Sequence, residues 1–266
     1  MHASRNVRAE AWGLLVAALT VLAPIRATAA EKPVERKPIV DVRADRLLRS
    51  MAEYLGQQKH FGVRADIEFD DVLETGQKVQ YSAVERVVVR RPDRVFVEYD
   101  GDLGANRLWY DGKRITVLDG VDNVYASATM PGKIDAAFDR LLREHGFSPP
   151  LTDILYSDPY AVLQPRIQFG LYLGLHDVDG VPCHHLAFVD KSIDWQIWIE
   201  DGPRILPRKL VITYTSVSGA PQFEAKLSDW DFGTTPSDVV FTPMLPPDSV
   251  EIDFLDVTRR VAPPKK

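Results

Sequence analysis

The sequence predicts an α+β protein with an antiparallel β-sheet, and three observations support this fold class. Between residues 61 and 69, apolar and polar side chains alternate with a period of two, as in a strand with one buried face. Residues 41–56 and 131–163 instead carry apolar side chains at helical spacing. The connections between predicted strands are short and rich in turn residues, and strands do not alternate with helices. This order argues against a parallel α/β sheet.

The first predicted element is an amphipathic helix over residues 41–56. Asp41 suits the N-cap position, and Gly56 suits the position where a helix ends. The apolar residues between them recur every three or four positions and would form one buried face: Ala44, Leu47, Leu48, Met51 and Leu55.

Strands follow this helix. Asp111-Gly112 is a strong signal for a hairpin turn, so the run 107–118 is predicted to form two strands. A turn near Gly120 leads to a short strand that ends at about Ser127. The other strands predicted in this half are 61–69, 77–90 and 94–99.

Helices are predicted again over residues 131–163, and strands follow them. The first helix begins at Ile134 and stops at Gly146; a shorter one runs from Pro149-Pro150 to Leu155, and Asp158-Pro159 opens a turn near Leu163. The strands predicted after this insertion are 177–190 with a turn at Gly180, 194–200, 208–216 and 222–232.

The amino terminus has the three-part order of a cleavable signal peptide over residues 1–29. Arg5 and Arg8 are basic, residues 11–25 are apolar, and residues 27–29 are small. An apolar run of about fifteen residues is short for a membrane span, which needs roughly twenty. The sequence therefore predicts an exported, soluble protein of the bacterial periplasm, with an uncleaved amino-terminal anchor as the alternative.

The single cysteine, Cys183, permits no intramolecular disulfide and lies far from the predicted cleavage site. The exported protein is therefore expected not to be lipid-anchored. Loss of residues 1–29 removes three arginines and one glutamate, so the formal net charge changes from −6 to −8. This acidic balance argues against nucleic acid as a partner.

One domain is predicted over residues 41–256, with the helical insertion at about 131–163. Residues 30–40 read as a flexible, charged tether, and residues 257–266 read as a Pro-rich tail. A single domain is the simpler interpretation because neither half of the chain has an obvious complete core.

Several segments resemble known proteins. Residues 91–95, RPDRV, and residues 109–113, WYDGK, resemble the LolA-like lipoprotein-carrier superfamily. The closer resemblance is to an uncharacterised family of predicted periplasmic proteins with that fold, and it extends over about 41–232. Further segments that carry it are 150–160, 179–188, 194–199 and 206–210. The resemblance implies a strongly curved sheet, a half-open barrel, with helices on its concave side. In the lipoprotein carriers the enclosed space takes acyl chains, but no individual site residue can be transferred.

Catalytic chemistry has little support in the sequence. His184 and His185 are adjacent on a predicted strand and therefore point to opposite faces, which makes a shared metal difficult. Cys183 beside them is interpreted as a small core residue, with a reactive thiol as the alternative. Asp66, Glu68 and Asp70 read as a solvated strand face. There is no G-x-S-x-G, H-E-x-x-H, P-loop or dinucleotide-binding motif.

Apolar residues on both faces of some strands favour a binding function. Trp195, Ile197 and Ile199 share one face of a strand while Trp198 occupies the other, so both faces need cover from helices or from a ligand. We therefore expect a non-catalytic carrier of a lipid or of lipoprotein acyl chains, with no cofactor and no metal, and an envelope membrane protein as a further partner. A structural or interaction protein with a filled core is the alternative, and an enzyme that uses His184 or His185 is a third reading. The expected lid is the segment from Pro131 to Gly174. The expected ligand-lining residues are Ile67, Phe69, Val97, Tyr99, Trp109, Trp198 and Tyr214.

Overall fold

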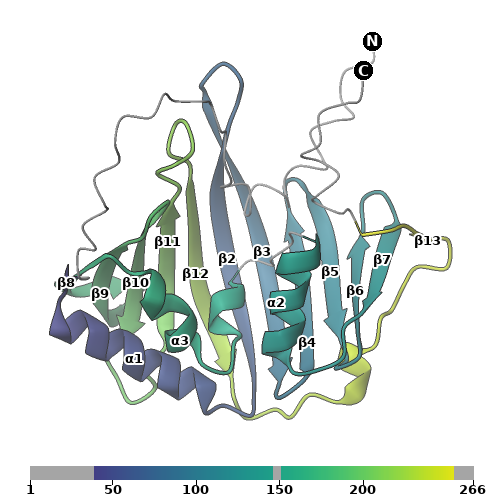
Figure 1. Cartoon of the computed structure of the whole chain (residues 1–266), viewed down its shortest axis with the longest axis horizontal. Coiled ribbons are helices and arrows are strands. Elements are labelled where there is room, and N and C mark those ends of the chain that lie inside the picture. The colour runs from purple at the N-terminus through teal and green to yellow at the C-terminus, as the bar shows by residue number, and fades with distance from the viewer. Residues whose placement is uncertain (1–38, 146–150, 255–266) are drawn as a thin grey trace, which may run out of the picture.

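The computed structural model describes residues 39–145 and 151–254, and a single mixed sheet contains all of their strands (Figure 1). The first antiparallel series comprises β2 (His60–Val72), β3 (Lys78–Arg90), β4 (Arg94–Gly101), β5 (Gly104–Tyr110), β6 (Arg114–Asp119) and β7 (Val124–Thr129). The second comprises β8 (Phe169–Val178), β9 (Val181–Val189), β10 (Asp194–Glu200), β11 (Pro207–Thr213) and β12 (Gln222–Asp231). The sequence-based prediction of an antiparallel α+β fold is confirmed.

The two series of strands join at the centre of the sheet. The last long strand, β12, pairs antiparallel with the first long strand, β2, so that Phe223 lies opposite Phe69 and Leu227 opposite Ala65. The resulting order is β1-β8-β9-β10-β11-β12-β2-β3-β4-β5-β6-β7-β13. Each series is a meander, and within the described residues only the β12–β2 pair connects them through backbone hydrogen bonds.

The tight turns follow from local sequence. Asp179 and Gly180 connect β8 to β9 with φ values of 51° and 82°, and this pair of positive angles suits an Asp-Gly turn between antiparallel strands. Gly112 between β5 and β6 also has a positive φ, 84°. The predicted Asp111-Gly112 hairpin is confirmed, and the Asp111 carboxylate accepts hydrogen bonds from the backbone of Lys113 and Arg114.

Both edges of the sheet carry a short parallel strand. β1 (Ile39–Val40) pairs with Phe169 and Gly170 of β8, and β13 (Val250–Glu251) pairs with Val124 and Tyr125 of β7. The prediction that the tether extends to residue 40 is therefore wrong at its end, because Ile39 and Val40 are held by backbone hydrogen bonds. Residues 1–38, which include the predicted signal peptide, and residues 255–266 lie outside the described residues.

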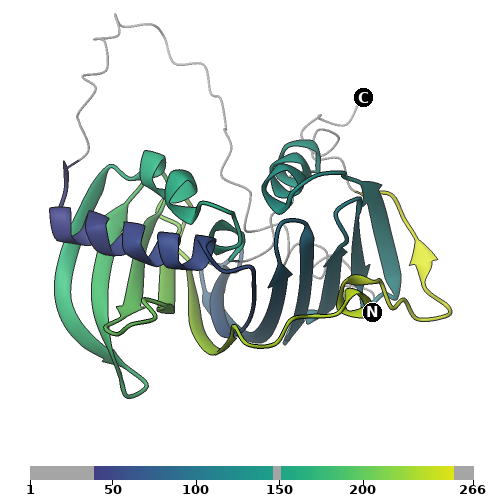
Figure 2. The same ribbon diagram turned by 90° about the horizontal axis from the view of Figure 1, so that it is seen from below.

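Helices cover one face of the sheet, which bends around them (Figure 2). They are α1 (Val42–Gly56), α2 (Ile134–His145) and α3 (Pro159–Leu163), with the short 3₁₀ helices η1 (Thr152–Ile154) and η2 (Gln164–Arg166). The Asp41 carboxylate caps α1 by accepting hydrogen bonds from the backbone N–H of Arg43 and Ala44, at 2.7 and 3.2 Å. We call the helix-covered face concave and the other face convex, and the predicted curved sheet is confirmed.

The main core lies between the helices and the concave face. On β2 the side chains of Phe61, Val63, Ala65 and Ile67 point to this face and are buried. The helices contribute their own apolar stripes, among them Leu48 and Met51 of α1 and Phe138 and Leu141 of α2. The alternating pattern in the sequence therefore identifies the buried face of this strand correctly.

Two parts of the chain differ from expectation. β8 begins at Phe169, so the expected lid from Pro131 to Gly174 is wrong over its last residues, which belong to the sheet. After β12 the chain runs along one end of the sheet to the far edge (Figures 1 and 2). On the way it forms a 3₁₀ helix, η3 (Asp238–Phe241), whose Phe241 is buried, and Arg90 donates a hydrogen bond to the carbonyl of Pro236.

Candidate functional site

The centre of the concave face carries a buried carboxyl group. Glu85 lies on β3 between Ala83 and Val87, two apolar residues that point to the same face. Its cross-strand neighbours are Ala65 on β2 and Tyr99 on β4. The Glu85 residue is 0% exposed, and neither carboxyl oxygen has a hydrogen-bond partner among the described residues. Buried polar groups are nearly always paired, so an unpaired one needs an explanation.

The environment of Glu85 favours its neutral form. Burial disfavours the carboxylate and raises the pKa of Glu85 from 4.5 to about 8. Tyr99 opposite it has a pKa raised to about 12, first by burial and then by the negative charge that Glu85 and Asp102 would carry. At neutral pH the concave face therefore presents an uncharged carboxylic acid, which has one O–H donor and can also accept.

Small residues surround this carboxyl group on the sheet. Ala65, Ala83 and Ala225 are buried and point to the concave face of β2, β3 and β12. Gly101 on β4 lies opposite Ala83, where an added Cβ would come within 2.6 Å of the Cβ of Ala83. The side chains at the middle of the sheet are therefore short, and the volume above them must be filled from the side of the helices.

The helical cover is held together by polar contacts. The hydroxyl of Tyr160 on α3 donates to Asp45 of α1 at 2.5 Å and accepts from Arg49 at 2.8 Å. The hydroxyl of Tyr156 donates to Asp139 of α2 at 2.8 Å. The cover therefore combines directional bonds between its own pieces with apolar packing, which has no preferred direction, against the sheet.

One partly buried side chain ties the cover to the sheet. Arg91, the residue after β3, donates from Nη1 to the carbonyl of Leu155 at 2.8 Å and from Nη2 to the carbonyl of Tyr156 at 2.9 Å. Burial lowers the pKa of Arg91. These two bonds fix the segment that follows η1 above the sheet.

Five of the seven expected ligand-lining residues lie on the concave side. Ile67, Val97 and Tyr99 belong to the buried core, and Phe69 and Tyr214 pack against it while remaining partly buried. Their role in binding stays a prediction. The side chains of β2 and β4 that were expected to point inward therefore lie on the face that the helices cover.

The other two expected residues, Trp109 and Trp198, lie on the convex face. Trp109 stands between Leu108 and Tyr110, which both point into the core, and its ring lies 5.8 Å from that of Phe96. Their assignment to the concave interior is therefore wrong, because successive side chains on a strand alternate between faces.

Neighbouring side chains, rather than a helix, contact Trp198. The ring of His185 stacks on it with centroids 3.9 Å apart, and the Lys209 ammonium lies 5.3 Å from its centroid. The expectation that a strand apolar on both faces requires helices or a ligand on both is therefore not met here.

The two adjacent histidines point to opposite faces, as predicted. His184 bonds through Nδ1 to the Tyr172 hydroxyl at 3.1 Å, and its Nε2 lies 3.2 Å from Asp201 Oδ1. His185 bonds to His176 and to Gln196, and burial lowers its pKa. Among residues 39–145 and 151–254, no group of three or more His, Cys, Asp or Glu side chains is placed to hold a metal ion.

Cys183 is a free, fully buried residue, as the core interpretation predicts. Its thiol donates to the carbonyl of Val181 at 3.3 Å, and burial raises its pKa to about 11. The thiolate is the reactive form of cysteine, so this position is poorly suited to nucleophilic chemistry.

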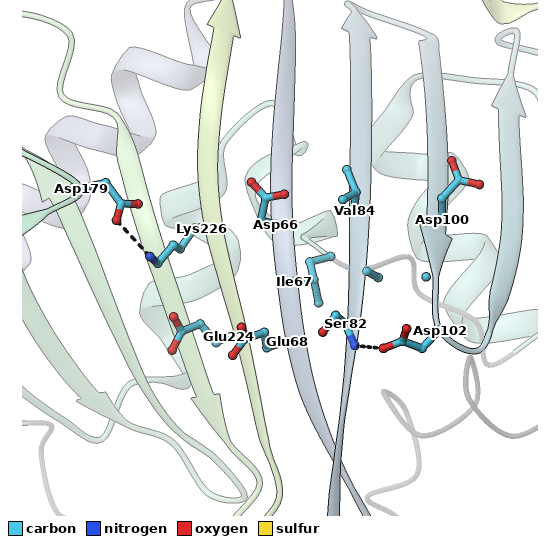
Figure 3. A pocket seen from close by; sticks show the side chains of 12 residues that line it. Asp66, Ile67, Glu68, Ser82, Val84, Asp100, Asp102, Asp179, Glu224 and Lys226 are labelled. Carbon is cyan, nitrogen blue, oxygen red and sulfur yellow. Dashed lines mark hydrogen bonds and ion pairs between the residues drawn. The ribbon is translucent and has the colours of Figure 1, made fainter.

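The convex face carries an acidic groove of about 590 Å³ (Figure 3). One lysine, Lys226, lies among its carboxylates and pairs with Asp179 at 3.0 Å. Asp66 and Glu68 are exposed there, as the predicted solvated strand face requires. The acidic residues that line the groove are Asp66, Glu68, Asp100, Asp102, Asp179 and Glu224. Such a groove repels anions, including phosphate backbones.

Sequence reasoning missed Glu85, although a signal was present. On β3 the residues of odd number from Val79 to Val89 form the concave series, and Glu85 is the one charged residue in it. A single ionisable residue inside an otherwise apolar series indicates either an error in register or a special site.

Fold and site together define a half-barrel protein whose apolar interior is covered by helices and holds one uncharged carboxyl group. The chain belongs to the family described as "Predicted periplasmic protein (DUF2092)", whose model matches residues 44–255. The predicted family is therefore confirmed. No helix in the described part of the chain has the length and apolar character needed to cross a bilayer. No curated protein matches the sequence.

Solved structures with a similar course of the chain include three bacterial proteins. An uncharacterized conserved protein from Thermus thermophilus has 11% identity and a TM-score of 0.47, with 79% of this chain and 99% of that chain covered. LprF from Mycobacterium bovis has 12% identity and a TM-score of 0.43, with 75% and 98% covered. A LolA superfamily protein from Nitrosomonas europaea has 12% identity and a TM-score of 0.35, with 75% and 97% covered. At these identities the similarities carry no information on ligand or activity.

Proposed function

We propose that the protein is a non-catalytic periplasmic carrier that holds a hydrophobic ligand, a lipid or the acyl chains of a lipoprotein, between its concave face and its helices. The proposal rests on one observation, the difference between the sheet on one side of the interior and the helices on the other. The sheet is continuous, whereas its cover consists of separate helices that rest on an apolar face. A cover of this kind can part from the sheet without breaking a strand.

The energetics of lipid transfer explain why such a shell is useful. Leaving an acyl chain of about fourteen carbons in water costs on the order of 11 kcal/mol, at about 0.8 kcal/mol for each methylene. A curved apolar sheet removes that surface from water without any catalytic group. The proposed lining residues are Ile67, Phe69, Val97, Tyr99 and Tyr214.

The periplasmic location has two supports. The family to which the chain belongs is described as predicted periplasmic, and the amino terminus has the order of charged, apolar and small residues typical of an export signal. The periplasm is an aqueous space between two membranes, where a carrier for hydrophobic molecules has a physical role.

Native mass spectrometry of the protein purified from its own host tests the proposal. A co-purifying mass that dissociates as a lipid supports a carrier. A chain that is bare, and that also fails to bind the apolar dye phenylnaphthylamine, contradicts it and favours an envelope scaffold with a filled core.

The variant Ala65→Leu separates these two functions further. If a ligand fills the space above Ala65, the larger side chain blocks dye binding and leaves the stability of the free protein nearly unchanged. If the protein's own side chains fill that space, the substitution costs about 1–3 kcal/mol of stability. Ala187→Leu on the convex face of β9 is the matched control, and it should leave dye binding unchanged.

An interaction module is the second candidate, and exposed leucines on β8 favour it. Leu171, Leu173 and Leu175 are 41, 43 and 53% exposed, and among the described residues β1 pairs only with Phe169 and Gly170 of β8. An apolar strand with an unpaired edge can accept another strand from a partner. Replacing the three leucines by lysine should abolish binding to such a partner, an envelope membrane protein for example, and leave dye binding intact.

A further inference from the structure

We propose that Glu85 donates a hydrogen bond to the ester carbonyl oxygen of an acyl ligand held against the concave face. This inference rests on the proposed carrier function and names the chemical class of its ligand. An O-acyl ester is distinguished from a plain hydrocarbon, or from an ether of the same length, by its carbonyl group.

The carboxyl group of Glu85 is enclosed and has no hydrogen-bond partner in the described part of the chain. Glu85 is fully buried at the centre of the concave face, and both of its oxygens lack a partner among the described residues. A buried polar group without a partner is destabilising, and no packing role requires one. A partner supplied by a ligand would satisfy it.

The surroundings of Glu85 determine which charge that partner can carry. Two side chains lie opposite Glu85 on the neighbouring strands, Ala65 on β2 and Tyr99 on β4. Ala65 is apolar, and of the two only Tyr99 is titratable. No basic residue faces Glu85 on β2 or β4. An ionised carboxylate in this environment would be costly, whereas a neutral carboxylic acid offers one O–H donor. The complementary ligand group is therefore an uncharged acceptor, such as an ester carbonyl.

The side chains beside the carboxyl group on the sheet are small. Small residues, Ala65 and Ala83, flank Glu85 on β2 and β3, and Gly101 lies opposite Ala83 on β4. Further along the same face lie Ile67, Phe69 and Val97. Because Glu85 is 0% exposed, a carbonyl reaches it once the helical cover parts from the sheet, and the attached hydrocarbon chain then lies along these apolar side chains.

A matched pair of lipids tests the proposal on the full chain. Palmitoyl lysophosphatidylcholine and its ether analogue, hexadecyl lysophosphatidylcholine, share headgroup and chain length and differ in the ester carbonyl. Their affinities are measured by calorimetric titration at about pH 6, below the critical micelle concentration, where Glu85 is protonated. We expect the ester to bind about tenfold more tightly than the ether, as one additional hydrogen bond predicts.

Two substitutions assign the discrimination to Glu85. Glu85→Gln keeps a donor in the form of its amide and should retain the preference for the ester. Glu85→Leu removes the donor and should abolish that preference without weakening the binding of the ether. Glu68→Leu on the convex face of the adjacent strand is the matched control and should leave both affinities unchanged.

Three results would overturn the inference. Equal affinities of the unsubstituted protein for the two lipids, or a preference that survives Glu85→Leu, would refute the ester contact and leave the carrier function standing. A preference for hexadecylamine over both lipids that is lost in Glu85→Gln would identify an ionised Glu85 and a cationic ligand instead. Failure to bind either lipid or the amine would refute the carrier function as well.

Discussion

Glu85 and Tyr99 lie directly opposite each other on β3 and β4, and both side chains point into the concave interior. Burial raises the pKa of each group, to about 8 for the carboxyl group and about 12 for the phenol. The negative charge of an ionised Glu85 contributes to the shift of Tyr99. The Glu85–Tyr99 pair is therefore uncharged at neutral pH, and ionisation of Glu85 is the first step that would change this.

Glu85 should make the stability of the protein depend on pH. Because its pKa is higher in the folded chain, about 8, than in the unfolded chain, about 4.5, the folded state retains a proton that the unfolded state has lost between these values. Stability should therefore fall as pH rises from about 4.5 to about 8, by at most about 1.4 kcal/mol for each pH unit from this group. Glu85→Gln removes this dependence, and urea denaturation at several pH values measures it.

The same comparison contains its own control. At pH values below about 4.5 the carboxyl group is neutral in both states, so the unsubstituted protein and Glu85→Gln should differ little there and increasingly above it. A difference in stability that stays constant from about pH 5 to about pH 8 would show that Glu85 titrates in the same way in the folded and unfolded chains.

Arg91 should hold the helical cover on the sheet. Arg91→Met keeps the apolar stem but removes the two hydrogen bonds to the carbonyls of Leu155 and Tyr156. We expect a loss of about 2 kcal/mol in the free energy of unfolding and faster exchange of apolar dye, since the segment after η1 loses its anchor. Arg86→Met is the control: Arg86 is 53% exposed and pairs with Glu98 at 3.3 Å, so its loss should cost less than about 1 kcal/mol.

Tyr160 should lock α3 to α1. Tyr160→Phe keeps the ring, over which the Arg49 guanidinium lies at 4.0 Å, but removes the hydroxyl that bonds Asp45 and Arg49. The expected cost is about 1 kcal/mol, together with faster amide hydrogen exchange in α3 and unchanged exchange in the central strands. Tyr125→Phe, whose hydroxyl lies 3.4 Å from Glu251, is the comparison. Unchanged exchange in α3 would mean that apolar packing alone positions this helix.

Cys183 should resist thiol reagents in the folded protein. With a pKa of about 11 and a fully buried side chain, only about one thiol in a thousand is ionised at pH 8. Labelling with a disulfide reagent should therefore be slow in buffer and immediate in concentrated denaturant. Rapid labelling without denaturant would contradict the buried position of this strand.

Alternation along strands made much of the fold predictable. The period of two in residues 61–69 and the Asp-Gly pair at 111–112 identified β2 and the β5–β6 hairpin, because both depend on local chemistry. The same method missed the start of β8, where Gly170 and Gly174 interrupt the pattern and a bulge lies between Tyr172 and Gly174.

The site was less predictable because it depends on which face the helices cover. Trp109 and Trp198 were expected in the interior, yet the period of a strand alone does not show which of its two faces the helices cover. Their neighbours Phe96 and His185 cover them through cross-strand contacts that sequence spacing does not reveal. Glu85 was missed because a charged residue was not expected on the buried, concave face of a strand.

The pairing of β2 with β12 has a consequence for the order in which the molecule assembles. A chain that emerges amino terminus first has β2 available early, but its partner lies more than a hundred and fifty residues downstream. Until β12 has been synthesised, β2 has one unpaired edge, and the two meanders cannot form one continuous sheet. Contacts at such long separation slow folding. The polypeptide thus cannot complete its sheet until nearly all of it has been synthesised, which is compatible with the proposed export before folding.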